Sequence, residues 1–83
     1  MEFYIISKNN NVAVPYSNGL QIVKEGDLYT VYPLNGNRLA LGCYDREEEA
    51  KKEIANANTA YKYFVCDCLA KNVTTIDTSY RLH

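Results

Sequence analysis

The sequence predicts an α+β fold in which an antiparallel sheet of four to five strands carries one long helix packed across one face. Three observations lead to this prediction. Short runs of β-branched and aromatic residues, separated by turn residues, fill the N-terminal half. The pair Asn35-Gly36 links two apolar runs, a pattern typical of a tight hairpin. A charged segment after Asp45 has apolar residues at helical spacing.

The expected strands share a composition rich in valine, isoleucine, leucine and tyrosine. They are residues 2–7, 12–16, 20–24, 28–34 and 38–44, and a turn at Glu25–Asp27 is expected to join 20–24 to 28–34 in a hairpin. Pro15 and Pro33 lack an amide donor, so we expect each to mark an edge or a strand end. The hairpin at Asn35-Gly36 should pair residues 28–34 with residues 38–44 in antiparallel fashion.

The helix is expected to begin within two or three residues of Asp45, which has the position of an N-cap before Glu48. Three glutamates in the first turn suit the positive end of the helix dipole. The apolar stripe is Ala50, Ile54, Ala57 and Tyr61. The solvated side is expected to hold Lys51, Lys52, Glu53, Asn56 and Asn58.

The segment after Tyr61 is compatible with more than one structure. Residues Tyr63–Leu69 either continue the helix or form a final strand, and their β-branched and aromatic content favours the strand. Residues 72–83 form a last short strand or a loosely held tail. The whole chain, 1–83, is expected to be one domain. The expected core is Phe3, Ile5, Ile22, Val31, Leu39, Leu41, Ala50, Ile54, Ala57 and Tyr61.

Composition excludes several classes of function. A net charge of −1 and a pI of about 5.7 argue against a nucleic-acid binder, because neutralising phosphates needs a basic surface. No apolar run is long enough for a membrane helix, and the N-terminus lacks the pattern of a signal peptide. Three cysteines without framework spacing indicate reduced thiols, as in a cytosol.

The residues needed for catalysis are not arranged in a recognisable pattern. The only histidine, His83, is the last residue, where we expect mobility rather than a Cys–His dyad. Cys66 and Cys68 would share one side of a strand, but a structural zinc site needs about four ligands, and two small buried residues are the simpler interpretation. We therefore expect neither an enzyme nor a metal or other cofactor.

Binding is the remaining class of function, and four residues are candidates. Arg38 and Tyr44 are expected on the outward face of one strand, with Arg46 at the adjoining helix start. A guanidinium and a ring suit a planar or phosphorylated ligand, although glutamates 47–49 would oppose a phosphate. Tyr32 belongs to the tyrosines expected on the uncovered face of the sheet. A surface arginine beside a half-buried tyrosine is the simpler alternative.

The same uncovered face predicts a homo-oligomer, most simply a dimer. It is expected to hold several of Tyr4, Tyr29, Tyr32 and Tyr44. So large an aromatic surface is unusual in contact with solvent on a small domain. Pairing across a two-fold axis would cover it.

The order of short motifs resembles a family of small proteins from phages and prophages of Gram-positive bacteria. The matching residues are Ile6-Ser7, Val14-Pro15-Tyr16, Leu41-Gly42-Cys43-Tyr44, then Asp45, Glu47, Glu48 and Ala50, and finally Ala60-Tyr61. Lys8 and Asn9 depart from the family's usual start. The resemblance implies a mobile-element protein that acts in the cytoplasm of a host bacterium, and it transfers no functional site.

Two functions fit these observations. The first is a viral inhibitor of a bacterial antiviral defence system, which either sequesters a nucleotide signal or blocks the surface of a host defence protein. The alternative is a structural or assembly subunit of a phage or host complex.

Overall fold

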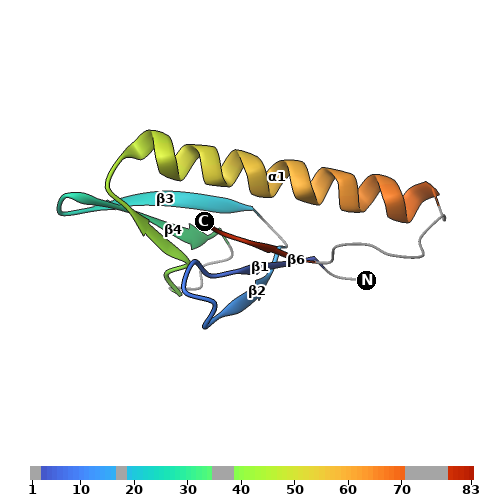
Figure 1. Cartoon of the computed structure of the whole chain (residues 1–83), viewed down its shortest axis with the longest axis horizontal. Helices are drawn as coiled ribbons and strands as arrows, with labels where there is room; N and C mark the ends of the chain where they lie inside the picture. Colours follow the sequence, from blue (N-terminus) through green and yellow to red (C-terminus); the bar gives the residue numbers. More distant parts are fainter. Residues whose placement is uncertain (1–2, 17–18, 35–38, 71–78) are drawn as a thin grey trace.

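The computed structural model describes residues 3–16, 19–34, 39–70 and 79–83 and has an α+β fold. A single helix, α1 (Glu47–Ala70), runs along the long axis of the molecule, and the described strands lie on one side of it (Figure 1). The strands are β1 (Tyr4–Ile6), β2 (Ala13–Pro15), β3 (Leu20–Glu25), β4 (Leu28–Pro33), β5 (Gly42–Tyr44) and β6 (Ser79–Arg81).

The described strands form two sheets of three strands, whereas the sequence predicted a single antiparallel sheet of four to five. One sheet has the order β2-β1-β6 and is called the β1 sheet; the other has the order β3-β4-β5 and is called the β4 sheet. All pairs are antiparallel except β1 and β6, which are parallel. The backbone joins the sheets where the N–H of Lys8 donates to the carbonyl of Leu41 at 2.7 Å.

The turn between β1 and β2 depends on a buried serine. Ser7 is 1 % exposed, and its hydroxyl accepts hydrogen bonds from the N–H groups of Asn11 and Val12, both at 3.1 Å. Asn10 has a φ of 64°, the left-handed geometry that asparagine tolerates. Two expectations for the prolines are confirmed: Pro15 lies in an edge strand, and β5 pairs with β4 only as far as Val31, before Pro33.

The predicted β3–β4 hairpin is confirmed, with Ile22 opposite Val31. The predicted pairing of residues 28–34 with 38–44 is found between Tyr29–Val31 and Gly42–Tyr44, while 39–41 are not a strand. The turn at Asn35-Gly36 lies outside the described residues.

Helix α1 begins at Glu47, two residues after Asp45, as predicted. The carbonyl that accepts the first helical hydrogen bond belongs to Arg46, so the N-cap is Arg46 rather than Asp45. The preference for a strand over Tyr63–Leu69 is wrong, because the helix continues to Ala70. Phe64 extends the apolar stripe by another turn, and its ring lies 5.2 Å from that of Phe3 and is buried.

The C-terminal segment returns to the start of the chain. Of the two predicted alternatives, the structure has the strand: residues Ser79–Arg81 pair with β1, with Tyr80 opposite Ile5. Leu82 is 1 % exposed and belongs to the core.

The core lies between α1 and the two sheets. Six of the ten predicted core residues are buried, namely Phe3, Ile5, Val31, Leu41, Ala50 and Ala57. Ile22, Ile54 and Tyr61 are half-buried at its margin. Leu39 is 41 % exposed, so its assignment to the core is wrong; it lies outside the paired part of β5, where strand alternation no longer orients it. Among the described residues, no helix is long and apolar enough to cross a membrane.

We expect Ile5→Ala to reduce the free energy of unfolding by about 2–5 kcal/mol, because the side chain is fully buried and its truncation leaves a cavity. The control is Ile6→Ala at the next position of the same strand, where the side chain is half-buried on the other face and the loss should be about half or less. Urea denaturation measures both. Equal losses would mean that the faces of β1 are assigned incorrectly.

Candidate functional site

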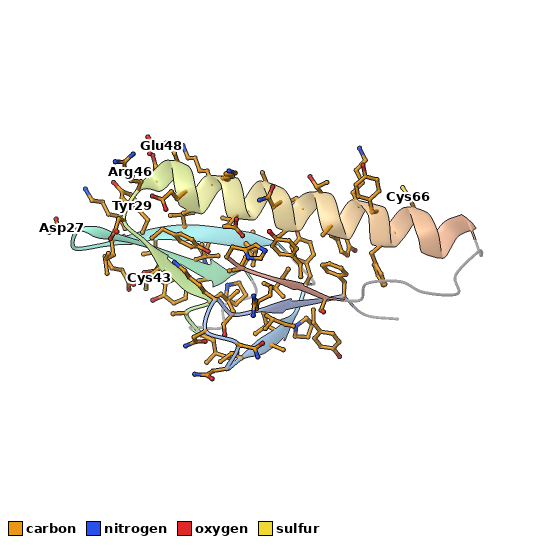
Figure 2. All side chains as sticks on the ribbon, in the orientation of Figure 1. Asp27, Tyr29, Cys43, Arg46, Glu48 and Cys66 are labelled. Atoms are coloured by element: carbon orange, nitrogen blue, oxygen red, sulfur yellow. The ribbon has the colours of Figure 1, made fainter. Side chains whose placement is uncertain are left out.

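The structure separates the binding residues that the sequence grouped together. Tyr44 pairs with Tyr29 and therefore lies on the face of the β4 sheet that α1 covers, whereas Tyr32 lies on the opposite face because side chains alternate along β4. Arg46 is exposed at the helix start, near Glu48 (Figure 2). Arg38 lies outside the described residues.

The expectation that Tyr44 faces outward is wrong, since its side chain is only 4 % exposed. Gly42 explains this position. A Cβ on Gly42 would lie 3.2 Å from the ring and from the hydroxyl of Tyr44, and 3.3 Å from Cβ of Lys8. The missing side chain therefore leaves space for the tyrosine ring to lie back over the strand. The ammonium of Lys8 lies 4.5 Å from the centre of the same ring.

A buried carboxylate on α1 is a polar feature that sequence reasoning missed. Glu53 is 8 % exposed, and its Oε1 accepts hydrogen bonds from the Tyr80 hydroxyl at 3.0 Å and from the backbone N–H of His83 at 2.9 Å. Its Oε2 accepts one from the Asn56 amide at 3.3 Å. We call these four residues the Glu53 cluster.

The placement of Glu53 on the solvated side of the helix is therefore wrong, and the backbone of His83 is held rather than mobile. The signal was present in the spacing: Glu53 follows Ala50 by three residues and precedes Ala57 by four, and both alanines are buried. A charged residue in an alanine-rich helix is usually exposed to solvent, so Glu53 was expected there. Its hydrogen-bond partners Tyr80 and His83 are distant in the sequence, and no local pattern predicts their contact with Glu53.

A small cavity adjoins the Glu53 cluster. Its volume is about 180 Å³, and its lining residues are Tyr44, Glu49, Lys52, Glu53 and His83. The Tyr44 hydroxyl is buried and has no hydrogen-bond partner among the described residues. Burial, followed by the nearby charge of Glu53, raises the pKa of Tyr44 to about 12. Burial and the hydrogen bond to Glu53 also raise the pKa of Tyr80.

A second, larger cavity adjoins Gly42. It has a volume of about 450 Å³, and it is lined by Lys8, Asn9, Ala40, Leu41, Gly42 and Cys43. Lys8 is the one cation in this lining, and its ammonium lies 3.4 Å from the carbonyl oxygen of Cys43. The cavity is therefore a mainly backbone-lined hollow with a single positive group.

The cysteines do not form a site in the part of the chain that the structure describes. Cys43 and Cys66 are free and exposed, so the interpretation of Cys66 as a small buried residue is wrong. Cys66 projects from α1 away from the sheets (Figure 2). The backbone at Cys68 is helical, which removes the strand geometry expected to place it beside Cys66. No three histidine, cysteine, aspartate or glutamate side chains of the described residues come together as metal ligands would.

Comparison of the chain with protein-family models, with curated proteins and with solved structures gives no match. The resemblance to small phage proteins therefore stays a prediction from the sequence.

We expect Tyr44→Phe to weaken the pH dependence of stability in alkali. An unfolded tyrosine has a pKa of about 10, whereas the pKa of Tyr44 in the folded chain is about 12. The unfolded chain loses this proton first, so the free energy of unfolding falls as the pH rises between these values. Between about pH 9 and pH 11, the wild type should lose about 1 kcal/mol more than the variant in urea denaturation.

Near neutral pH the same variant should be at least as stable as the wild type, because it removes a buried hydroxyl that lacks a partner. Tyr80 titrates in both proteins and cancels in the comparison. Parallel pH profiles for the two proteins would contradict the raised pKa of Tyr44.

Gly42→Val should destabilise the fold by about 1–3 kcal/mol, because the added atoms overlap the Tyr44 ring and the base of the Lys8 side chain. The matched control is Ala40→Val, at an exposed position two residues earlier, where no comparable loss is expected. Thermal unfolding followed by circular dichroism measures both. A Gly42→Val variant as stable as its control would show that Tyr44 does not need this space.

Proposed function

We propose that this chain is a phage- or prophage-encoded binding protein that inhibits a bacterial antiviral defence system in the host cytoplasm by covering the surface of a host protein. The observation that carries the proposal is the face of the β4 sheet opposite α1, which we call the outer face. Leu28 and Leu34 are 41 % and 49 % exposed there. The side chains that share this face are Gln21, Val23, Glu25, Leu28, Thr30, Tyr32, Leu34 and Cys43, of which Thr30 is buried.

Charge at one end of the molecule supports a partner with a basic surface. The tip of the β3–β4 hairpin and the start of α1 lie at the same end, where Asp27 and Glu48 are both at the surface (Figure 2). The exposed carboxylates at this end are those of Glu25, Asp27, Asp45, Glu47, Glu48 and Glu49, and they outnumber the exposed cations of the same segments, Lys24, Arg46, Lys51 and Lys52. Complementary charge would orient a basic partner against the adjacent outer face.

Sequestering a nucleotide is the less supported form of the same function. The cavity beside Glu53 is smaller than the roughly 300–1,000 Å³ of pockets that enclose drug-sized ligands, and two carboxylates line it. The cavity of about 450 Å³ is large enough, but Lys8 is its one cation. Tyr44, the ring expected to stack on a base, is buried below the surface.

A second copy of the chain is the competing occupant of the outer face. The prediction of a dimer depended on several tyrosines lying there, but Tyr29 and Tyr44 lie on the face that α1 covers. The aromatic surface available for self-association is therefore smaller than the sequence indicated. In addition, a two-fold axis close to the acidic end would bring the carboxylates of two copies together, and their repulsion disfavours such a dimer.

The test is the plating efficiency of a sensitive phage on bacterial strains that each carry one defence system and express this chain. We expect the wild type to restore plating on one of them. Leu28→Lys should abolish this restoration, because burying a charge at the contact in place of an apolar side chain has a desolvation cost. The control is Thr59→Lys, at an exposed position of α1.

Restoration that survives Leu28→Lys would show that the outer face is not the contact surface. Light scattering that reveals a dimer in the wild type and a monomer in Leu28→Lys would assign the face to a second copy. Failure to restore plating on any strain, with incorporation of the chain into phage particles, would favour an assembly subunit.

A further inference from the structure

The β4 sheet ends at β3, and the far edge of this strand, which we call the β3 edge, is unpaired in the part of the chain that the structure describes. One bond fixes the direction of its backbone groups: the carbonyl of Gly19 accepts from the N–H of Leu34 at 3.0 Å. In an antiparallel pair, every second residue bonds to the neighbouring strand. The residues whose N–H and C=O groups point away from β4 are therefore Leu20, Ile22 and Lys24.

The β3 edge is the longest edge among the described strands. β3 has six residues, whereas the other strands that end a sheet, β2, β5 and β6, have three each. None of the outward backbone groups of Leu20, Ile22 and Lys24 has a hydrogen-bond partner among the described residues. A row of unpaired donors and acceptors on a strand is a template for another extended chain.

Side chains along the β3 edge select the composition of the chain that fits it. Leu20, Ile22 and Val23 are half-buried apolar residues. At the other end, Glu25 closes the strand and Asp27 follows in the turn, and both carboxylates are exposed. Neither of them forms an ion pair with a described lysine or arginine. A complementary segment is therefore apolar along most of its length and basic where it passes Glu25.

Lys24 does not occupy the place of that basic residue. Side chains alternate along a strand, so Lys24 lies on the face opposite to that of Glu25. Its ammonium lies 5.9 Å from the centre of the Tyr29 ring on the strand next to it. The face that carries Glu25 therefore keeps its negative charge at this end of β3.

We propose that the β3 edge binds an extended segment of the host protein, which adds to the sheet as an antiparallel strand and places a lysine or arginine beside Glu25. Antiparallel pairing puts this basic residue at the N-terminal end of the segment. In strand addition, backbone hydrogen bonds supply affinity and alternate side chains supply specificity. Strand addition stands on the geometry of the β3 edge alone, whereas its source in a host protein rests on the proposed function.

The test is an NMR titration of the full chain with the hexapeptide acetyl-Arg-Thr-Val-Val-Thr-Val-amide. In the proposed register its arginine lies opposite Glu25 and its fourth residue lies opposite Ile22. The backbone amide resonances of Leu20, Ile22 and Lys24 should shift, because their N–H groups gain acceptors. Replacing the arginine by citrulline, which is neutral and of similar shape, should lower the affinity by about two- to fivefold, as expected for an exposed ion pair.

Two methylated peptides separate strand pairing from nonspecific adhesion. N-methylation of the fourth residue removes a donor that faces β3 and should lower the affinity by about tenfold or more. The control carries the methyl group on the third residue, also a valine, whose N–H points away from β3, and it should bind like the parent peptide. Equal affinities of the two methylated peptides, or no shifts with the parent peptide, would overturn the proposal.

A variant of the chain tests the same bonds from the other side. Lys24→Pro removes an outward N–H, and proline is tolerated on an edge strand where its missing donor faces solvent, so we expect it to fold. The control Lys24→Gln makes the same change of charge and keeps the N–H. Lys24→Pro should bind the peptide about tenfold or more weakly than this control. If Lys24→Pro fails to fold, the methylated peptides still decide the outcome.

Plating with these variants distinguishes this proposal from the proposed function. Loss of restoration in Lys24→Pro, but not in Lys24→Gln, supports a host segment on the β3 edge. Restoration by Lys24→Pro together with loss in Leu28→Lys would overturn the β3 edge as the contact while the proposed function stands. Peptide binding without restoration by the wild type on any strain would overturn the host source but not strand addition.

Light scattering gives the remaining outcome. A wild-type dimer that becomes a monomer in Lys24→Pro, but stays a dimer in Leu28→Lys, would assign the β3 edge to a second copy of the chain and overturn the proposal of a host segment.

Discussion

The fold depends on one helix, because α1 is the only layer that covers both sheets in the described part of the chain. The buried side chains of α1 change in size along the helix, and each part suits the sheet that it covers. Ala50 and Ala57 are fully buried where the helix backbone comes close to β3, β4 and β5. Farther along, the larger side chains of Tyr61 and Phe64 reach the ring of Phe3 in the β1 sheet. A helix of 24 residues, about 36 Å long, accounts for most of the 45 Å length of the molecule.

A polar contact adds to the packing that the apolar stripe of α1 makes. Glu53 lies between Ala50 and Ala57 in the alanine part of the helix, and its carboxylate joins α1 to the segment that contains β6. Burying a carboxylate has a desolvation cost, which its three hydrogen bonds offset. A buried carboxylate of this kind adds little to the free energy of unfolding. It is better suited to fixing where the C-terminal segment lies and to keeping a charged group at the edge of a cavity.

Sequence predicted the local features of this fold and missed those that depend on distant partners. The β3–β4 hairpin and the start of α1 have signatures within a few residues, and both were found where expected. The strand preference over Tyr63–Leu69 failed because packing of Phe64 against Phe3 outweighs β propensity. The burial of Glu53 involves contacts with Tyr80 and His83, 27 and 30 residues away. The β1 sheet is completed by the pairing of β1 with the distant β6. Of the candidate binding residues, Tyr44 was expected on a surface but is buried on the face of the β4 sheet that α1 covers.

The parallel pairing of β1 with β6 has a consequence for synthesis on the ribosome. Tyr4 lies opposite Ser79, so the two strands are about 75 residues apart, and closing so long a loop is slow compared with forming a hairpin. While the chain is being made, β1 has only β2 as a neighbour, and its other edge is unpaired until residues 79–81 emerge. An unpaired edge invites strands from other chains. The nascent protein is thus most exposed to aggregation, and most in need of a chaperone, during the interval in which α1 is already complete and the β1 sheet is not.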